Sequence, residues 1–260
     1  MTSSLPLSVV YITLNAERLL LRSLMSVQRI AGEILIVDAG SADATVEIGK
    51  QVGARIIERP WSGFGAQRQF SVESARHDWV LVMDADEVLR DSAALSITHL
   101  LQNPHGKVAF RLRRRSFLQN RPVRFGDWNH DWVLRFMDRR QGHYNSVAVH
   151  ESWQTTGPVG RIKGTSIDHY SYENYLALVE KMQSYAALSA LQIHHRGKKV
   201  RHYMPMAHAL AAFSRSYAWR LGFLDGVNGA AIAWTTALGA FMKYAVALEL
   251  QEQAAKEGER

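Results

Sequence analysis

The chain contains no cysteine among its 260 residues. This absence excludes a disulfide framework and a thiolate metal site, and it is compatible with a reducing cytoplasm. No basic residue precedes the first apolar run, and residues 9–14 are too few to form the core of a signal peptide. We therefore expect no export.

Two common enzyme signatures are also missing. The first predicted strand, at 7–13, is followed by Asn15-Ala16-Glu17 and not by a G-x-G-x-x-G turn, so a dinucleotide site of the usual kind is excluded. His150-Glu151 suggests the zinc motif H-E-x-x-H, but Gln154 stands where the second histidine is required. A carboxylate beside an imidazole is better interpreted here as a general base.

Composition indicates a folded domain with an acidic partner. Hydrophobic residues make up 47% of the chain, which is enough for a sizeable core, and the formal net charge is +7. The positive charge favours a nucleotide, an anionic lipid surface or nucleic acid, and it does not separate these three.

The most informative stretch is 79–87, where an apolar run ends in carboxylates. Trp79 to Met83 is typical of a strand buried on both faces, and Asp84, Asp86 and Glu87 follow it directly. Ligands of open α/β sheets bind at the carboxyl ends of strands, so the aspartates are candidates to hold a divalent cation on a diphosphate. The alternative is a solvated turn that caps the helix beginning near residue 91.

The rest of the first half alternates between strand and helix patterns. Strands are expected at 7–13, 33–37 and 54–58 as well as at 79–83, with Ser41 as the N-cap of a helix that runs to Gln51. This order predicts βαβ units and a mostly parallel sheet. Asp38, at the end of the second strand, either reaches a ribose or base of a nucleotide or bonds its own backbone, and both interpretations stay open.

The second half changes in character. Residues 107–115 are strand-like but rich in arginine, which is typical of a solvated edge. An aromatic and acidic loop, 126–132, leads into a strand at 133–137, and another strand is expected at 144–150. Trp128 in this loop suits stacking on a sugar ring, although a half-buried tryptophan is more common.

Helices are expected at 172–195, 204–224 and 230–250, with a basic loop at 194–202. The apolar stretch 226–242 contains Asn228 and threonines, which favours a packed or monotopic helix over a spanning one. Docking on an anionic leaflet and simple packing on the sheet are both compatible with this pattern.

Several motifs together resemble family 2 inverting glycosyltransferases of the GT-A fold, most closely the bacterial type that adds glucose to the inner-core heptose of lipopolysaccharide. The motifs lie at 9–17, 36–43, 84–87, 149–151, 169–172 and 222–226. This resemblance implies an α/β fold with a Rossmann-like, mostly parallel sheet flanked by helices. It implies a GT-A domain at 1–170, with a nucleotide half at about 1–103 and an acceptor half at about 104–170. A helical extension at 171–260 follows, and both membrane association and simple packing stay open for it.

The resemblance also implies residue roles. A UDP-sugar donor would be bound with Mg²⁺ or Mn²⁺, and Asp86 would be the direct metal ligand. The remaining assignments are Thr13, Asn15, Glu17, Asp38, Gln67, Arg68 and Asp84 for the nucleotide sugar, Asp84 also for the metal, Glu151 or else Asp131 as the base, and Trp128, His130, Arg135 and His150 for the acceptor. Related chains often carry Trp-Tyr-Pro-Asp where this chain has Asn129 and His130 in the middle of the motif, which affects the acceptor.

The implied product is a hexose, glucose in the type most resembled, on a glycolipid such as the lipopolysaccharide inner core. The expected location is the cytoplasmic face of the inner membrane, with no nucleic-acid partner. Two alternatives remain at this point. One is a phosphatase of the haloacid-dehalogenase type, which also places Asp-x-Asp after a strand. The other is a non-enzymatic, basic module that binds membrane or RNA through the arginines of 111–124.

Overall fold

A computed structural model describes residues 5–145 and 152–258 as two compact units. The first unit contains the chain up to Arg115 and His130–Tyr170, and the second contains Ser116–Asn129 and the chain from Ser171. Residues 116–129, which the sequence analysis groups with the first domain, therefore lie in the second unit. The functional division into a transferase domain and an extension stays a prediction.

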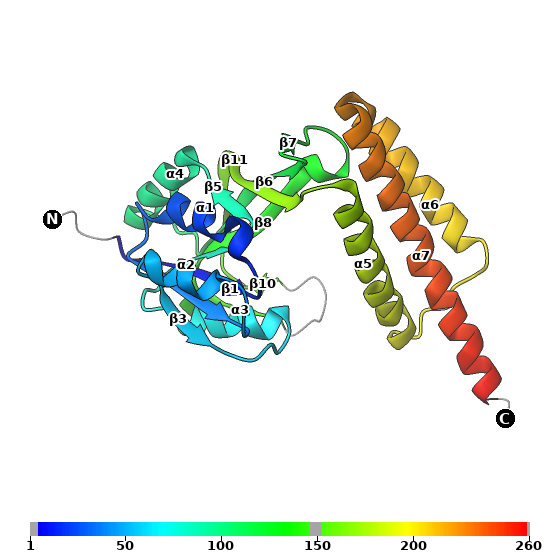
Figure 1. The fold of residues 1–260 in the computed structure, drawn as a ribbon, viewed down its shortest axis with the longest axis horizontal. Helices are drawn as coiled ribbons and strands as arrows, with labels where there is room; N and C mark the ends of the chain where they lie inside the picture. The colour runs from blue at the N-terminus through cyan, green and yellow to red at the C-terminus, as the bar shows by residue number, and fades with distance from the viewer. Residues whose placement is uncertain (1–4, 146–151, 259–260) are drawn as a thin grey trace. The chain divides into compact units, whose positions relative to one another are not determined.

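Four parallel strands form one half of the main sheet in the first unit (Figure 1). In spatial order they are β3 (Arg55–Glu58), β2 (Glu33–Asp38), β1 (Leu7–Thr13) and β4 (Trp79–Met83). All four were predicted to within one residue. Their apolar runs are continuous because helices cover both faces of this half.

Antiparallel strands extend the sheet beyond β4. They are β8 (Asp131–Asp138), β6 (Ala109–Leu118), β11 (Val159–Tyr172) and β5 (Glu87–Leu89), with β7 (Arg121–Pro122) paired to β6. The expectation that the basic strand is a solvated edge is wrong, because β6 lies between β8 and β11. The long strand β11 was not predicted. A separate small sheet pairs β9 (His143–Tyr144) with β10 (Trp153–Gln154), and most of the strand expected at 144–150 lies outside the described residues.

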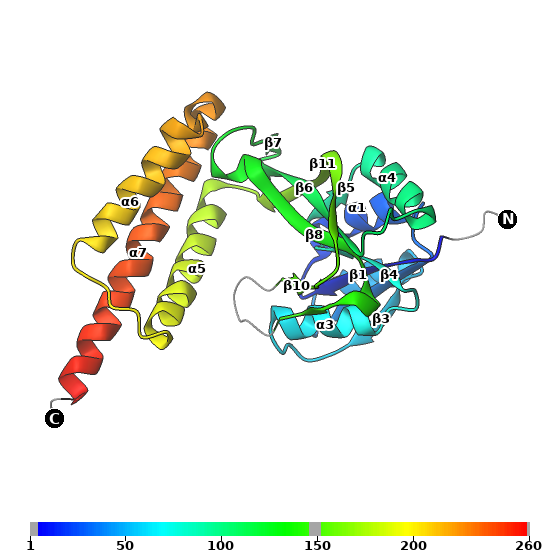
Figure 2. The ribbon, with the colours of Figure 1, turned by 180° about the vertical axis from the view of Figure 1, so that it is seen from behind.

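Helices cover both faces of the parallel half (Figures 1 and 2). The four are α1 (Glu17–Val27), α2 (Thr45–Gln51), α3 (Phe64–Glu73) and α4 (Asp91–Gln102). α1, α2 and α4 pack against one face, where Leu20, Leu24 and Ile97 are fully buried, and α3 packs against the other through Val72. This sheet with helices on both faces confirms the predicted α/β class.

The start of α2 corrects one prediction. The residue before the helix is Ala44, and its side chain makes no capping hydrogen bond. Ser41 is not the N-cap, because its hydroxyl donates to Asp38 Oδ1 at 2.6 Å and accepts from the Asn15 backbone at 2.8 Å. The Ser41 hydroxyl therefore connects two loops instead of capping the N-terminus of a helix.

The second unit is mainly helical. Its elements are α5 (Tyr175–His195), α6 (Met204–Ser214), the π-helical turn η3 (Arg215–Trp219), the 3-10 turn η4 (Gly222–Asp225) and α7 (Gly226–Gly258). The α-helix predicted at 204–224 thus ends at Ser214, and a π-helical turn and a 3-10 turn follow it. The stretch 222–256 is long and apolar enough to cross a membrane by length and composition, a test that core helices of soluble proteins also pass.

Candidate active site

The acidic turn lies between β4 and β5 at the carboxyl end of the parallel strands. Its backbone is fixed by two hydrogen bonds: the Glu87 amide donates to the Asp84 carbonyl at 3.0 Å, and the Tyr170 amide donates to the Asp86 carbonyl at 2.9 Å. β5 pairs with β11 so that Glu87 stands opposite His169. The strand that the sequence did not reveal therefore forms one wall of the turn.

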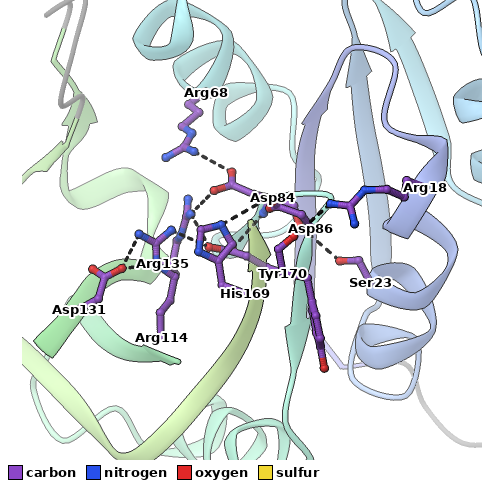
Figure 3. Close-up of polar contacts among 11 residues, drawn as sticks. Arg18, Ser23, Arg68, Asp84, Asp86, Arg114, Asp131, Arg135, His169 and Tyr170 are labelled. Carbon is purple, nitrogen blue, oxygen red and sulfur yellow. Dashed lines mark hydrogen bonds and ion pairs between the residues drawn. The ribbon is translucent and has the colours of Figure 1, made fainter. Parts of the chain in front are cut away.

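Asp84 is held by two guanidinium groups (Figure 3). Arg68, from α3, donates to Oδ1 at 2.7 Å, and Arg135, from β8, makes a short contact with Oδ2. Burial opposes ionisation of Asp84, but the positive charges of Arg135, Arg68 and Arg114 outweigh it and hold the pKa of this carboxyl well below its usual range. Asp84 is therefore an anion whose two oxygens both have cationic partners.

Glu87 extends this network into the core. Its side chain is fully buried and accepts from the Asp84 amide at 3.0 Å, from Arg114 at 3.0 Å and from Arg135 at 2.8 Å. Arg114 also pairs with Asp131 at 2.6 Å. We call Asp84, Glu87, Arg68, Arg114, Arg135 and Asp131 the acid–arginine network. Its three acids and three arginines balance in charge, which is what a buried set of ions requires.

Asp86 projects from the other side of the turn. Its carboxylate is 30% exposed, and Oδ2 lies 3.4 Å from His169 Nε2 on β11. Among the described residues, no group of three or more histidine and acidic side chains is arranged to hold a metal ion. The donor set thus fits an open site, in which one or two protein groups share a Mg²⁺ or Mn²⁺ with phosphate oxygens.

α1 anchors β11 beside the turn. Arg18 donates to the Tyr170 carbonyl at 3.0 Å, and Arg22 donates to the Tyr170 hydroxyl at 2.7 Å while lying 4.3 Å from the centre of its ring. These contacts, drawn in part in Figure 3, place His169 next to Asp86.

The predicted nucleotide residues of the first two loops come together. Asp38 is buried and accepts from the Thr13 hydroxyl at 2.7 Å and from the Gly40 and Ser41 amides at 3.0 and 2.7 Å. Burial raises the pKa of Asp38, but these donors outweigh it and lower the pKa overall. The interpretation of Asp38 as a turn residue is confirmed, and its contact with a nucleotide stays a prediction.

Asn15 and Glu17 brace the same pair of loops. Asn15 adopts a left-handed conformation, with φ of 50°, and its side-chain oxygen accepts from the Ala42 amide at 2.9 Å. Glu17 accepts from the Ala44 amide at 3.0 Å. Gln67, fully buried in α3, donates to the Arg59 carbonyl at 3.0 Å and so holds the loop that precedes the helix. We call this part of the molecule the loop brace, made of Thr13, Asn15, Glu17, Asp38 and Ser41.

Two of the residues predicted to bind the acceptor, Trp128 and Arg135, have described side chains, and they belong to different units. Trp128 belongs to the second unit, where it stacks on Tyr172 with ring centres 5.2 Å apart. Arg135 is buried, with 3% of its side chain exposed, and serves the acid–arginine network. The side chain of His130 and the whole of His150 and Glu151 lie outside the described residues.

Sequence reasoning gave no role to His169, Arg114 or Tyr170. The strand-like stretch 159–170 was the available signal for β11, and it would have placed His169 on the same face as Ile167, because residues two apart in a strand share a face. Nothing in the sequence pairs Arg114 with Glu87, because the two residues lie 27 positions apart on strands that are not adjacent in the sheet.

Comparison with known proteins agrees with this geometry. Residues 8–157 match the model of Glycosyl transferase family 2. The chain is 30% identical over 259 residues to the lipopolysaccharide core biosynthesis glycosyltransferase LpsC of Rhizobium meliloti (strain 1021), covering 95% of this chain and 96% of LpsC. It is 26% identical over 252 residues to the uncharacterized glycosyltransferase RP128 of Rickettsia prowazekii (strain Madrid E), covering 92% and 85% of the two chains.

A solved structure is similar over a smaller part. Glucosyl-3-phosphoglycerate synthase from Mycobacterium tuberculosis, in complex with Mn²⁺, UDP-glucose and phosphoglyceric acid, matches 42% of this chain and 43% of its own, at 23% identity and a TM-score of 0.37. This likeness is too limited to bear on the function.

The chain belongs to glycosyl transferase family 2. It is a glycosyltransferase, and its α/β sheet together with the family match confirms the predicted GT-A type of fold. The family match also overturns both alternatives that the sequence left open, the haloacid-dehalogenase type of phosphatase and the non-enzymatic basic module.

Proposed function

We propose that the protein transfers a hexose, glucose in the first instance, from a UDP-sugar to a glycolipid of the lipopolysaccharide inner-core type, with inversion at the anomeric carbon. Family membership and the similarity to LpsC along nearly the whole chain support this proposal. The observation that carries it is the position of Asp86, a partly exposed carboxylate beside His169 at the carboxyl end of β4. A cytoplasmic enzyme at the face of the inner membrane fits a lipid-linked acceptor.

Of the two aspartates predicted to bind the metal ion, we keep only Asp86 as its ligand. Both oxygens of Asp84 carry guanidinium partners, so this residue is better suited to shaping the turn than to ligating a cation. Asp86, with His169 next to it, would hold Mg²⁺ or Mn²⁺. When bound, the cation would offset the negative charge that develops on the departing diphosphate.

The nucleotide half of the donor is assigned to the loop brace and its surroundings. Thr13 and Asp38 are the last residues of β1 and β2, and Asn15 and Glu17 follow β1, at the carboxyl ends of strands where ligands of α/β sheets bind. Gln67 and Arg68 follow on α3. Because the loop brace is already closed by its own hydrogen bonds, it offers UDP a surface that needs little reordering.

The transfer step requires a base across the sugar from the diphosphate. The acceptor hydroxyl oxygen forms a bond to the anomeric carbon, the bond from that carbon to the diphosphate breaks, and its electron pair leaves with UDP. The hydroxyl proton passes to a carboxylate. We assign this role to Glu151, with Asp131 second, because the ion pair of Asp131 with Arg114 commits it to the acid–arginine network.

The acceptor is assigned to Trp128, His130 and His150. Arg135 is reassigned from the acceptor to Asp84 and Glu87, because its guanidinium group is buried and bonded to both.

A panel of UDP-hexoses, offered with Mn²⁺ and a purified inner-core oligosaccharide, tests the proposal. We expect mass spectrometry to show one added hexose with one donor, and nuclear magnetic resonance to show the inverted linkage. If no UDP-sugar gives a product and another nucleotide sugar does, the proposal of a UDP-sugar donor is wrong. Transfer with retention would reject the single-step mechanism.

The base is tested by Glu151→Gln and Asp131→Asn. Glu151→Gln should keep its affinity for UDP and lose turnover, because only proton transfer is affected. If Asp131→Asn loses turnover and Glu151→Gln keeps it, Asp131 is the base and Glu151 is not.

A further inference from the structure

The junction between α6 and α7 exposes apolar side chains on a rigid frame. We define the apolar elbow as residues 215–227, which include the π-turn η3, the 3-10 turn η4 and the start of α7. Trp219 is 86% exposed and Val227 72%, and Leu221, Phe223 and Leu224 are exposed as well. A cluster of exposed large apolar residues on a folded protein marks an interaction site.

The frame of the elbow is closely packed and lies wholly in the second unit. A Cβ atom on Gly222 would lie 2.5 Å from the Ser216 carbonyl oxygen, and one on Gly229 would lie 1.8 Å from the Gly222 carbonyl oxygen. Asp225 accepts from the backbone amides of Arg124 and Phe125 at 2.9 and 2.8 Å. The motif at 222–226 therefore holds the turn in one shape.

Backbone strain supports a functional role for this shape. Leu221 has a φ of 58°, a left-handed conformation that is uncommon for a leucine. The preceding π-turn is itself a rare element that occurs often at functional sites. The unusual backbone exposes Leu221 and Phe223, which a regular helix continuing from α6 would place differently.

The apolar surface continues from the elbow along α6 and α7. Phe213, Tyr217, Phe223 and Trp234 form a chain of ring contacts with centres 4.6 to 6.2 Å apart. Exposed Met206 and Leu210 follow on α6, and exposed Leu238 follows on α7. In the most apolar window of the stretch 222–256, 28% of the residues are buried.

The charges around the elbow are few and mostly positive. Between residues 203 and 242 the charged side chains are Arg215, Arg220 and Asp225. Both arginines pair with Asp127 at 3.1 and 2.7 Å and remain partly exposed, and Asp225 is used by the backbone amides. With exposed Arg124, three arginines face two aspartates, which favours an anionic partner.

We infer that the apolar elbow is a membrane-docking surface, which inserts Trp219, Leu221, Phe223, Leu224 and Val227 into the interface of a bilayer that contains anionic lipid. Tryptophan beside arginine is the combination that suits the headgroup level, where one end of the side chain is apolar and the other is wet. This inference rests on the proposed glycolipid acceptor, because such a substrate lies in a membrane.

Vesicle flotation tests the surface directly. The full chain is mixed with vesicles of phosphatidylethanolamine and phosphatidylglycerol, or of phosphatidylcholine alone. We expect binding to the anionic vesicles and a loss on the order of tenfold, about 1.4 kcal/mol, in the combined variant Trp219→Ser, Phe223→Ser and Val227→Ser. Leu95→Ser, which removes a 64% exposed leucine from α4 in the first unit, is the matched control and should bind like the wild type.

A second readout locates the contact. Brominated acyl chains should quench part of the tryptophan fluorescence of the wild type, and Trp219→Phe should remove that part while keeping vesicle binding. The combined variant should melt at the temperature of the wild type, because all three side chains are exposed.

Equal vesicle binding by the wild type and the combined variant would overturn the inference. So would light scattering that shows a wild-type dimer that the combined variant dissociates, with no vesicle binding by either. The two proposals fail separately. Vesicle binding without transferase product would reject the enzyme's proposed substrates and leave the docking surface in place. Unchanged kcat of the combined variant on a soluble oligosaccharide would show that the elbow serves docking alone.

Discussion

The loop brace and the acid–arginine network stabilise similar carboxylates in opposite ways. Asp38 and Asp84 both follow a buried parallel strand, and the pKa of each is lowered. Asp38 is stabilised by neutral hydroxyl and amide donors, whereas Asp84 is stabilised by two guanidinium groups. Neutral donors keep the loop brace negative and rigid, while the arginines balance the charge of Asp84. The side chains of Asp84 and Asp86 are similarly exposed, 24% and 30%, so the two guanidinium partners of Asp84, and not burial, distinguish the two acids.

This difference explains why the two aspartates of the acidic turn do not share one role. A cation placed near Asp84 would also meet Arg68 and Arg135, and repulsion between like charges would oppose its binding. Asp86 lies beside a histidine on β11 instead. The difference in partners supports the proposal that Asp84 shapes the site and that Asp86 binds the cation.

The largest expected effect comes from removing a buried arginine of the network. Arg135→Leu removes one of the two arginine partners of the fully buried Glu87 and the guanidinium partner of one Asp84 oxygen, and it unbalances the charge of the network. We therefore expect a loss of about 3–5 kcal/mol in the free energy of unfolding, measured by urea denaturation. Arg29→Met, which breaks a pair with Asp91 in which both side chains are exposed, is the control and should cost less than about 1 kcal/mol. Equal losses in both variants would contradict a buried, charge-balanced network.

Asp86→Ala should lower turnover by about 10²–10³-fold and lower the free energy of unfolding less than Arg135→Leu does, because Asp86 lies outside the acid–arginine network. Steady-state kinetics with the active UDP-sugar and a melting curve check both halves of this prediction. Asp86→Asn serves as the isosteric control and should be impaired to a similar degree. Full activity of either variant would remove Asp86 from the site.

Asp38→Ala should cost about 1–3 kcal/mol of stability, because it leaves the Thr13 hydroxyl and two backbone amides without their acceptor. Asp38→Asn keeps an acceptor oxygen and should cost less. Measured by urea denaturation, the order of the two variants shows whether neutral donors stabilise the loop brace. A larger loss for the asparagine variant would contradict this view.

The smallest expected effect is on the pH dependence of the free energy of unfolding. The pKa of Asp84 is lower in the folded than in the unfolded chain, so its contribution to stability is fully present above the unfolded pKa of about 3.9 and is lost as the pH falls through the folded value. The stability difference between the wild type and Asp84→Asn should therefore stay constant between about pH 5 and 8 and narrow only below about pH 4. If the stability difference between the two proteins narrows already at neutral pH, Asp84 is not held as an anion.

Local patterns predicted much of the fold. β1 to β4 were located because buried parallel strands are continuous apolar runs, and the acids after β4 were recognised as the candidate site for the same reason. Ser41 was misassigned because serine serves equally well as a helix cap and as a bridge between loops. The end of α6 was missed because no glycine or proline separates it from the π-turn that follows.

The contacts within the site could not be predicted from the sequence, because they depend on non-local strand pairing. The arginines of β6 resemble a solvated edge until β8 and β11 pair on both sides and bring Glu87, Asp131 and Asp168 to them. The same pairing supplies His169. These contacts depend on which strands become neighbours, and no spacing within one segment encodes that.

The central claim is that Asp86 holds the cation that binds the donor diphosphate. Isothermal titration calorimetry of UDP, with and without Mn²⁺, on the wild type and on Asp86→Asn tests it most directly. The account predicts that Mn²⁺ tightens UDP binding to the wild type and that Asp86→Asn loses this gain while retaining its metal-free affinity for UDP. The same gain from Mn²⁺ in both proteins would contradict it.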